Sequence, residues 1–364
     1  MTATTGPAQR LPALRQCLEK DSLPALLVTN TLNLQYLTGF TGSAGQAVVT
    51  PDQAAIFVDS RYFLQAEREA SLFEMVKIES PRKHPEVVAE FIQKLGLAEI
   101  GFESSLPYES YADLGEKLSG VALKPVKGMI EGMRLVKDAD EIARLRGAAA
   151  ILDACYRHVL PFLRPGMAER EIAVEIECFV RRQGAEREAF ESIVASGPLA
   201  ASPHARATEK LIESGELVKM DFGAMFRGYA GDITRTVAIQ RADAKQREVY
   251  GVVLEAQEAA LAAIRPGAKG SDVDKVARDR IAARGYGDYF GHGLGHSLGR
   301  SVHDGQAFSP TSEVVLEPGM VVTVEPGVYI PGWGGVRIED DIVVTDAGCE
   351  VLTHAPKEFT IVGA

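Results

Sequence analysis

Residues 215–223 read Gly-Glu-Leu-Val-Lys-Met-Asp-Phe-Gly, and residues 319–327 read Gly-Met-Val-Val-Thr-Val-Glu-Pro-Gly. In both stretches an acid stands six positions after the first glycine and two before the last. The apolar residues that precede each acid are typical of buried strands. The two stretches therefore predict a pair of equivalent strands, each carrying a carboxylate, Asp221 in the first and Glu325 in the second.

The similarity extends into the sequence that precedes each stretch. Arg-Pro-Gly at 164–166 recurs at 265–267, an offset of 101 residues. Each tripeptide stands between two helical patterns, which are 151–163 and 171–182 in the first copy and 249–264 and 273–283 in the second. Each second helix is followed by a glycine, the usual left-handed stop. This pattern predicts two half-domains related by pseudo-symmetry, with their acids facing each other.

The first third of the chain has a different organisation. Short apolar runs at 25–29, 47–50 and 55–59 indicate strands, and the patterns at 61–71 and 86–95 indicate helices. Strands that alternate with helices predict an α/β layer. A polar segment at 127–140 with two glycines indicates a boundary. We predict an N-terminal domain over residues 1–132 and a second domain over residues 133–364.

Composition excludes several functional classes. The formal net charge is −11, which argues against nucleic acid or an anionic membrane as a main partner. The chain has no run of 18 apolar residues and no apolar signal segment near Met1, so we expect neither a membrane span nor secretion. Four cysteines without CxxC spacing indicate neither a disulfide scaffold nor a zinc finger. We expect reduced thiols in a cytoplasmic protein.

Asp221 and Asp232 are eleven positions apart. Two strands joined by a turn at Arg227-Gly228 would place the two carboxylates side by side. Adjacent carboxylates repel and raise one pKa unless a cation lies between them, so the pair indicates a divalent metal. The alternative is that both acids are turn or cap residues facing water, against which the apolar residues around them argue.

A glycine-rich stretch at 291–299 reads Gly-His-Gly-Leu-Gly-His-Ser-Leu-Gly, and His303 follows it. Three glycines in five positions disfavour a helix, so His292 and His296 are not the pair of an HExxH zinc helix. The spacing also fits neither a dinucleotide-binding motif nor a P-loop. A single histidine would more often be structural, but three among glycines that permit close backbone approach indicate a site.

The last acids are Glu325 in Val-Glu-Pro-Gly and Glu339 in Val-Arg-Ile-Glu-Asp-Asp. Strand-forming residues flank Glu339, and charged groups in such strands are rarely buried unless they are paired or bind metal. Strand alternation places Asp341 on the face of Glu339 and Asp340 on the other face.

Together these candidates form an oxygen-rich donor set of four carboxylates and one imidazole: Asp221, Asp232, His296, Glu325 and Glu339. Such a set suits two hard or borderline divalent ions, with manganese favoured and cobalt or zinc as alternatives. A dinuclear centre of this kind supports metal-assisted hydrolysis.

Several motifs resemble the pita-bread metallopeptidases of the Xaa-Pro branch, which contains prolidase and aminopeptidase P. They are Ser196-Gly197-Pro198, Pro203-His204-Ala205, Met220 to Ala224, Asp232 to Thr236, His292 to His296, Val324 to Gly327 and Val336 to Asp340. Leu37 to Ser43 and Asp59 to Tyr62 are similar to the N-terminal domain of that family. The resemblance covers nearly the whole chain. It implies a creatinase/prolidase-like α/β domain followed by a pseudo-symmetric pita-bread catalytic domain.

The resemblance also implies a role for each metal ligand. Asp221 would bind one ion, Asp232 and Glu339 would bridge both ions, and His296 and Glu325 would complete the other. Glu325 would also move the proton from the nucleophile to the leaving nitrogen.

Four further groups would surround the ligands. His204, His292 and His303 would position the substrate and donate hydrogen bonds to the tetrahedral intermediate. Arg337 resembles an arginine that braces the bridging acids, and the alternative is an ordinary surface charge on a strand.

One position departs from the family pattern. Many prolidases have an arginine four residues after the histidine that matches His303, where it binds the free carboxylate of the dipeptide, and this chain has Ala307 there. We therefore expect aminopeptidase P activity ahead of prolidase activity, with Xaa-Pro-Xaa tripeptides cleaved faster than Xaa-Pro dipeptides. Arg61 in the N-terminal domain of a second subunit is a candidate replacement for the missing cation.

Three other functions are weaker alternatives. A catalytically silent pita-bread binding module and a creatinase-like amidinohydrolase would lack the metal ligands, and all five are present here. A methionine aminopeptidase would lack the long N-terminal domain. We expect proline-containing peptides as substrates and a homodimer as the assembly.

Overall fold

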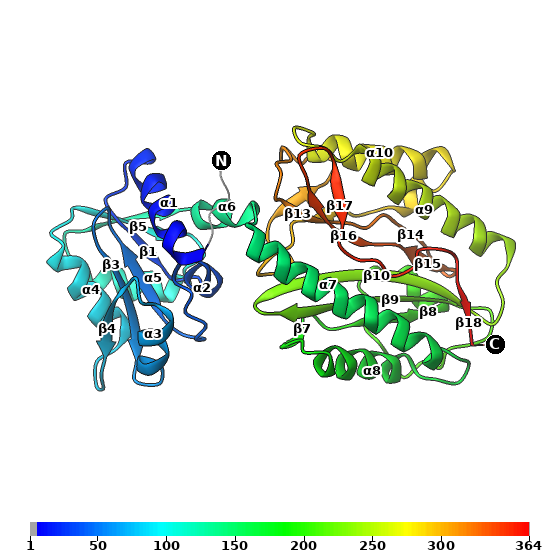
Figure 1. Cartoon of the computed structure of the whole chain (residues 1–364), viewed down its shortest axis with the longest axis horizontal. Helices are drawn as coiled ribbons and strands as arrows, with labels where there is room; N and C mark the ends of the chain where they lie inside the picture. The colour runs from blue at the N-terminus through cyan, green and yellow to red at the C-terminus, as the bar shows by residue number, and fades with distance from the viewer. Residues whose placement is uncertain (1–5, 364) are drawn as a thin grey trace. The chain divides into compact units, whose positions relative to one another are not determined.

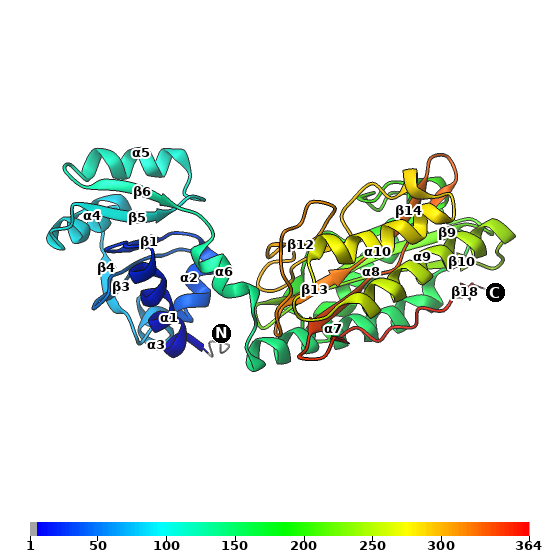
Figure 2. The same ribbon diagram turned by 90° about the horizontal axis from the view of Figure 1, so that it is seen from above.

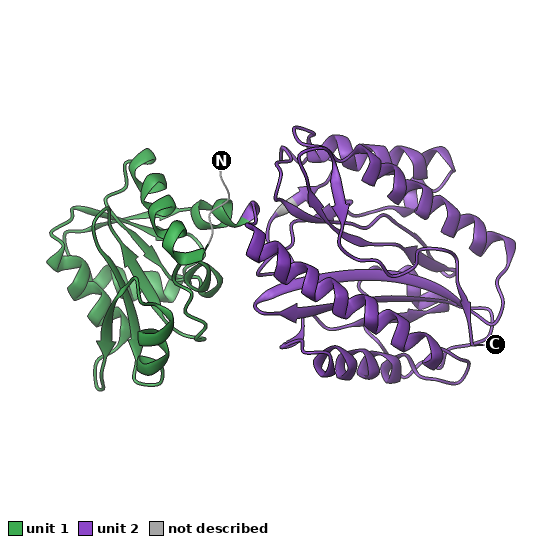
Figure 3. Ribbon diagram, viewed as in Figure 1, with its two compact units in different colours: residues 1–134 green, residues 135–364 purple. Residues whose placement is uncertain are grey.

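A computed structural model describes residues 6–363. These residues form two compact units, divided between Arg134 and Leu135 (Figure 3). The segment between the two units begins with a helix, α6 (Met129–Leu135), and the domain bounds 1–132 and 133–364 stay a prediction. Ile130 of this helix packs in the core of the first unit, so the helix belongs mainly to that unit.

The first unit is built on a six-stranded sheet with the order β4-β3-β2-β1-β5-β6. Its strands are β1 (Leu26–Val28), β2 (Gln46–Val49), β3 (Ala54–Asp59), β4 (Glu74–Ile78), β5 (Glu99–Glu103) and β6 (Ala122–Val126). Its other helices are α1 (Gly6–Lys20), α2 (Thr31–Thr38), α3 (Phe63–Glu69), α4 (His84–Lys94) and α5 (Tyr108–Lys117).

Strand alternation explains why helices cover both faces of this sheet. Leu26 and Val28 of β1 pack in the core that includes residues of α1, α2 and α3, whereas Leu27 packs in the core that includes residues of α4 and α5. Successive side chains of a strand point to opposite faces, so a strand that is apolar at every position needs cover on both. Figure 2 shows α4 and α5 on one side of the strands and α1 and α3 on the other. The predicted α/β layer is confirmed.

The second unit contains two pairs of helices and a set of mostly antiparallel strands. The helices are α7 (Ala139–Val159), α8 (Glu169–Arg182), α9 (Ala244–Ala263) and α10 (Gly270–Ala283). The first strands are β7 (Arg187–Glu188), β8 (Ile193–Ser196), β9 (Leu217–Phe226), β10 (Tyr229–Ile239), β11 (Gly295–His296) and β12 (Gln306–Phe308). The later strands are β13 (Val321–Val324), β14 (Gly327–Ile330), β15 (Gly334–Arg337), β16 (Asp340–Val344), β17 (Cys349–Val351) and β18 (Ile361–Val362).

The sequence repeat corresponds to a repeat in backbone geometry. Gly166 and Gly267, which close the two Arg-Pro-Gly tripeptides, have φ angles of 86° and 82°. Their amides donate to Ile212 and Leu316, at 2.9 Å and 2.8 Å, so each tripeptide is tied to the segment that leads into the next acid-bearing strand. A left-handed φ favours glycine, which explains why both copies retain it. The predicted pseudo-symmetry of the second unit is confirmed.

Each helix pair packs against its own strands. Apolar residues of α7 and α8 share a core with β9 and β10, and those of α9 and α10 share a second core with β13 to β16. Figure 1 shows the strands between the two helix pairs. Each set of strands is therefore covered by helices on one face, and its other, polar face is free to form the site.

One predicted helix begins earlier than expected. The helix predicted at 151–163 is α7, which begins at Ala139 and ends at Val159. Asp138 and Glu141 form a reciprocal capping box at its start, with backbone-to-carboxylate distances of 2.9 Å and 3.0 Å. Charged residues on its exposed side masked the helical pattern and resembled a linker.

Within residues 6–363 no helix is both long and apolar enough to cross a membrane, and all four cysteines are free.

Candidate metal centre

The second unit encloses a cavity of about 750 Å³. All the residues that the sequence predicts as metal ligands or catalytic groups line it: Asp221, Asp232, His204, His292, His296, His303, Glu325, Arg337 and Glu339. These residues span 136 positions of the chain, from 204 to 339. The fold therefore gathers the whole predicted set in one place.

The first two acids come from the β9–β10 hairpin. The two strands are antiparallel, with Asp221 opposite Thr234 and Asp232 opposite Gly223. The turn falls at Arg227-Gly228, where both residues have positive φ, as a two-residue hairpin turn requires. Asp232 and Thr234 are two apart on one strand and so share a face. Asp221 and Asp232 are therefore diagonal neighbours on the same face of the hairpin.

The other ligand candidates come from the second half of the unit. Glu325 follows the end of β13, and Glu339 lies between β15 and β16 and not within one continuous strand. The break occurs because β15 pairs with β14 whereas β16 pairs with β13. The Glu339 amide instead donates to the Thr234 carbonyl at 3.1 Å, which attaches the acid to the β9–β10 hairpin.

The glycines around His296 permit close packing against β13. A Cβ atom added at Gly295 would overlap the backbone carbonyl oxygen of Thr323, and one at Gly293 would lie 2.6 Å from the Phe308 carbonyl oxygen. The amide of His296 donates to Thr323 Oγ1 at 3.1 Å. A side chain at either glycine would push His296 away from the acids.

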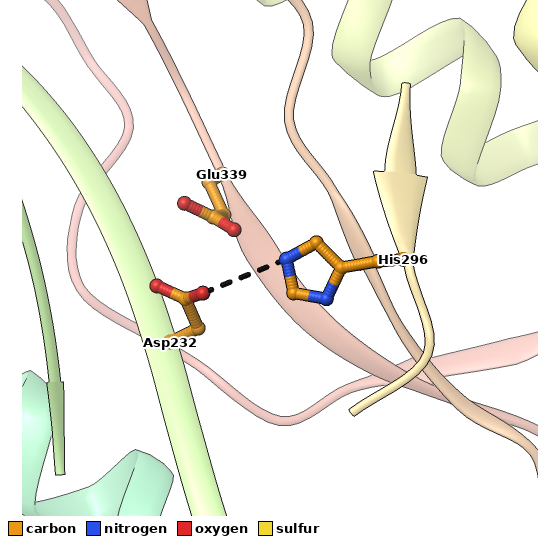
Figure 4. Close-up of side chains that lie close together, drawn as sticks. All are labelled: Asp232, His296 and Glu339. Atoms are coloured by element: carbon orange, nitrogen blue, oxygen red, sulfur yellow. Dashed lines mark ion pairs between the residues drawn. The ribbon is translucent and has the colours of Figure 1, made fainter. Parts of the chain in front are cut away.

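Asp232, His296 and Glu339 form the tightest group of donors. One ligand atom from each lies within 4.8 Å of the other two, and Figure 4 shows the three side chains pointing toward one another. His296 Nε2 is 3.8 Å from Asp232 Oδ2 and 3.5 Å from Glu325 Oε1. His296 Nδ1 lies 3.3 Å from the Ser297 carbonyl oxygen, so it can donate there while Nε2 faces the acids.

The carboxylates lie where burial makes their charged forms energetically unfavourable. Burial, followed by neighbouring carboxylates, raises the pKa of Asp232 and of Glu339 well above the usual range. Burial raises the pKa of Glu325 to about 7. Oδ1 of Asp221 and Oδ1 of Asp232 are buried without a hydrogen-bond partner within the described residues. Buried acceptors without donors need a cation, so the residues fit a divalent metal.

Arg337 is the positively charged residue that contacts this cluster of carboxylates. Its guanidinium donates to Asp221 Oδ2, to Thr234 Oγ1 at 2.9 Å and to Tyr329 Oη at 3.0 Å. The residue is only 3% exposed, so it is not a surface strand charge. It holds Asp221 in place and offsets part of the negative charge in the pocket.

The three predicted accessory histidines differ in their surroundings. His292 Nε2 lies 2.9 Å from Tyr329 Oη, and burial lowers the pKa of His292 to about 4, which keeps the ring neutral. The ring of His303 lies 4.2 Å from that of His296, centroid to centroid. His204 is exposed in the loop between β8 and β9. His292 is half-buried, and the other two are exposed at more open parts of the wall.

Sequence reasoning missed the residues that hold the ligands in place. Thr234 Oγ1 donates to Glu339 Oε2 at 2.6 Å and also accepts from Arg337. Arg235 is fully buried and donates to Asp340 Oδ1 at 2.7 Å and to the Glu339 carbonyl oxygen. Both follow Asp232 in a run of strand formers, and strand alternation could have placed Thr234 on the face of Asp232. No local signal assigns Arg235 its partners, which lie more than 100 residues away.

Comparison with known families identifies the class of this protein. The model of metallopeptidase family M24 matches residues 143–346, and that of the creatinase/prolidase N-terminal domain matches residues 10–136. The M24 match alone covers more than half of the chain. The protein therefore belongs to metallopeptidase family M24 and is a hydrolase.

More similar proteins define the branch. The structure of an Xaa-Pro dipeptidase from Bacillus anthracis is 42% identical, with a TM-score of 0.95 over 98% of this chain and 100% of that one. An Xaa-Pro dipeptidase of Pyrococcus horikoshii is 37% identical over 96% of this chain and 98% of its own length. The structure of an X-Pro aminopeptidase from Thermotoga maritima is 35% identical, with a TM-score of 0.88 over 94% of this chain and 98% of that one. The chain is a member of the Xaa-Pro peptidase branch with the pita-bread fold.

Proposed function

We propose that this protein is an Xaa-Pro dipeptidase that hydrolyses the bond between an N-terminal residue and a C-terminal proline. The observation that carries the proposal is the convergence of all nine predicted site residues in one cavity of an M24 fold. Xaa-Pro dipeptidases among the similar proteins support the choice of substrate.

This proposal corrects the order of preference from the sequence. Ala307 led us to rank aminopeptidase P first, but the similar proteins favour the dipeptidase. Position 307 is not the only place from which the cavity can receive a cation. Ala307 lies in β12 on the cavity wall, and a carboxylate in the cavity can be met by a cation from another part of that wall. Aminopeptidase P stays the second candidate, favoured by Ala307 itself.

Five residues would hold the divalent ions of this metallopeptidase. These are Asp221, Asp232, His296, Glu325 and Glu339, of which Asp232, His296 and Glu339 lie closest together and would form the centre of the site. When bound, the ions supply an acidified water as nucleophile and polarise the scissile carbonyl. Manganese suits a donor set with four carboxylates, and it stays the predicted metal. The homodimer and the cytoplasmic location stay predictions as well.

The chain's own groups would perform the proton transfers. The leaving group is the proline nitrogen, which has no hydrogen in the peptide and must receive a proton when the bond breaks. Glu325 is a carboxyl on the cavity wall and would carry the proton from the nucleophile to this nitrogen. His303 and His204 line the same cavity and can donate hydrogen bonds to the developing oxyanion, whereas neutral His292 donates from Nδ1 to the Gly293 carbonyl oxygen and can position substrate through Tyr329.

Two non-peptidase alternatives fit less well. A silent binding module or an amidinohydrolase without metal would not need four carboxylates converging in one buried pocket. The raised pKa values of Asp232 and Glu339 show that this convergence is unfavourable without a cation. Such an arrangement is retained for binding or catalysis and not for stability.

Substrate length tests the proposed function. We expect Ala-Pro to be hydrolysed with a kcat/KM about tenfold or more above that of Ala-Pro-Ala when manganese is added, and Ala-Ala to be cleaved poorly. The products are measured by chromatography over the same substrate range. A preference for the tripeptide would replace the dipeptidase with aminopeptidase P, and cleavage of neither would remove both.

Metal binding should change the pH dependence of stability. Glu325 has a higher pKa in the folded chain than its usual value of 4.5, so the folded state binds more protons than the unfolded state. The contribution of Glu325 to the free energy of unfolding of the metal-free protein should therefore fall as pH rises from about 4.5 to about 7, and the lowered pKa values of His292 and His296 oppose it.

Divalent metal should reverse this trend, because it binds deprotonated carboxylates. At a metal concentration about 100-fold above Kd, the stabilisation is about 2.7 kcal/mol. We expect the difference in Tm between manganese-loaded and EDTA-treated protein to be larger at pH 8 than at pH 5.5, measured by thermal unfolding. An equal difference at both pH values would contradict the model, and Asp232→Asn serves as the control with weakened metal binding.

A further inference from the structure

A dipeptide substrate brings its own negative charge into a cavity whose metal ions, under the proposed function, are already bound by four carboxylates. The wall carries five carboxylates, on Glu191, Asp221, Asp232, Glu325 and Glu339. In a dipeptide that ends in proline, the free carboxylate is only a few bonds from the scissile bond, so it must enter the cavity with it. Removing a carboxylate from water without a cationic partner is strongly unfavourable. If the proposed dipeptidase function holds, the wall needs a cation for this group.

The described residues that line the cavity include two arginines and no lysine, and they are not equivalent. Arg337 is buried and already donates to Asp221, Thr234, Tyr329 and the Pro203 carbonyl oxygen. Its guanidinium therefore has little capacity left for a substrate. Arg206 is the other arginine, and its side chain is 81% exposed.

Arg206 is well placed to reach a bound substrate. It lies two residues after His204 in the loop between β8 and β9, and both residues line the cavity. Within residues 6–363 its one ion pair joins Nε to Glu191 Oε2 at 3.5 Å, and the Glu191 side chain is 65% exposed. An exposed pair of this length contributes little and exchanges readily. Among the described residues, the terminal nitrogens of Arg206 have no hydrogen-bond partner, so they can bind a carboxylate in the bidentate manner.

We propose that Arg206 binds the C-terminal carboxylate of the substrate and thereby sets the preference for dipeptides. Glu191 competes for the same guanidinium and holds it at the cavity wall when no substrate is bound. In this assignment Arg206 is a specificity-determining residue. The cation that is absent at Ala307 is supplied from the loop that also carries His204.

The test compares a dipeptide with its own amide. Ala-Pro and Ala-Pro-amide differ only in the terminal charge, so the ratio of their kcat/KM values isolates recognition of the carboxylate. Arg206→Gln should lower this ratio about tenfold to a hundredfold, mainly through the KM of the dipeptide, as expected for loss of a charge-assisted hydrogen-bond pair. Arg206→Lys should give an intermediate ratio, since lysine keeps the charge but not the planar fork.

Two further variants control the interpretation. Glu191→Gln removes the competing acid and should raise the ratio about two- to fivefold. Arg284→Gln removes another surface arginine, whose side chain is 47% exposed, pairs with Glu255 at 3.1 Å and does not line the cavity. This variant should leave the ratio unchanged, so a nonspecific effect of surface charge would be visible.

The outcomes separate the two proposals. If the unmodified protein hydrolyses Ala-Pro and Arg206→Gln keeps the same ratio, the assignment of Arg206 is wrong and the dipeptidase function stands. If the unmodified protein cleaves Ala-Pro-Ala but not Ala-Pro, the dipeptidase function fails, and this inference fails with it. A lowered ratio in Arg206→Gln together with a raised ratio in Glu191→Gln supports the assignment.

Discussion

Asp232→Asn and Glu339→Gln should each lower kcat/KM for an Xaa-Pro dipeptide by about 10³-fold or more. Each change removes one charged oxygen ligand from the tightest donor group, which the two acids form with His296. Loss of one preorganised electrostatic contact commonly costs about 10²- to 10³-fold, and each acid is proposed as a metal ligand as well.

The same variants should not damage the fold. Asp232 has a raised pKa in the metal-free pocket, so a neutral amide imitates the protonated form that the fold prefers. In EDTA we expect Asp232→Asn to unfold at the same Tm as the unmodified protein or at a higher one. Metal content is measured by atomic emission, activity by product release and stability by thermal unfolding.

A matched acid far from the cavity controls for charge. Glu350 is exposed at the surface, where it pairs with Arg146 at 2.7 Å. Glu350→Gln should retain metal and activity. Full turnover by Asp232→Asn after exhaustive chelation would show that this carboxylate does not bind a catalytic metal.

Arg235→Met should lower the free energy of unfolding by about 3–5 kcal/mol, the range for breaking a buried ion pair. Arg235 is fully buried and donates to Asp340, at 2.7 Å, and to the carbonyl oxygens of Glu339, Ala355 and Pro356. Methionine has similar length but no donor, so these buried acceptors would lose a partner. Urea denaturation at constant pH measures the change.

Arg235 also connects the two halves of the metal centre. It extends from β10, the strand of Asp232, and donates to the backbone of Glu339 in the other half. We therefore expect Arg235→Met to weaken metal binding as well as stability. The control is Arg146→Met, which removes an arginine whose pair with Glu350 is about half exposed and should cost less than about 1 kcal/mol. Equal effects of the two substitutions would show that the buried network contributes nothing beyond surface charge.

The candidate site residues could be named from the sequence because each lies in a short, recognisable motif and the chain contains two copies of the surrounding pattern. Each ligand candidate follows a short apolar run or stands among glycines, and these patterns are readable within ten residues. The offset of 101 residues then indicated that two such units face each other. The order of the ligand candidates, their residue types and the half-domain in which each lies could therefore be predicted without the tertiary structure. The same locality explains the error at α7, where charged residues on the exposed side hid a helix that its capping box could have revealed.

Only the tertiary structure decided which charges are buried and which are available. Arg337 and Arg206 look alike in the sequence, but one is 3% exposed and surrounded by acceptors, whereas the side chain of the other is 81% exposed at the cavity wall. The partners of Arg235 lie more than 100 residues away, and strand periodicity carries no information about such distant pairs. Burial and long-range pairing depend on how whole layers pack, so the residues that line the cavity could be named from the sequence, but the buried groups that contact and position them could not.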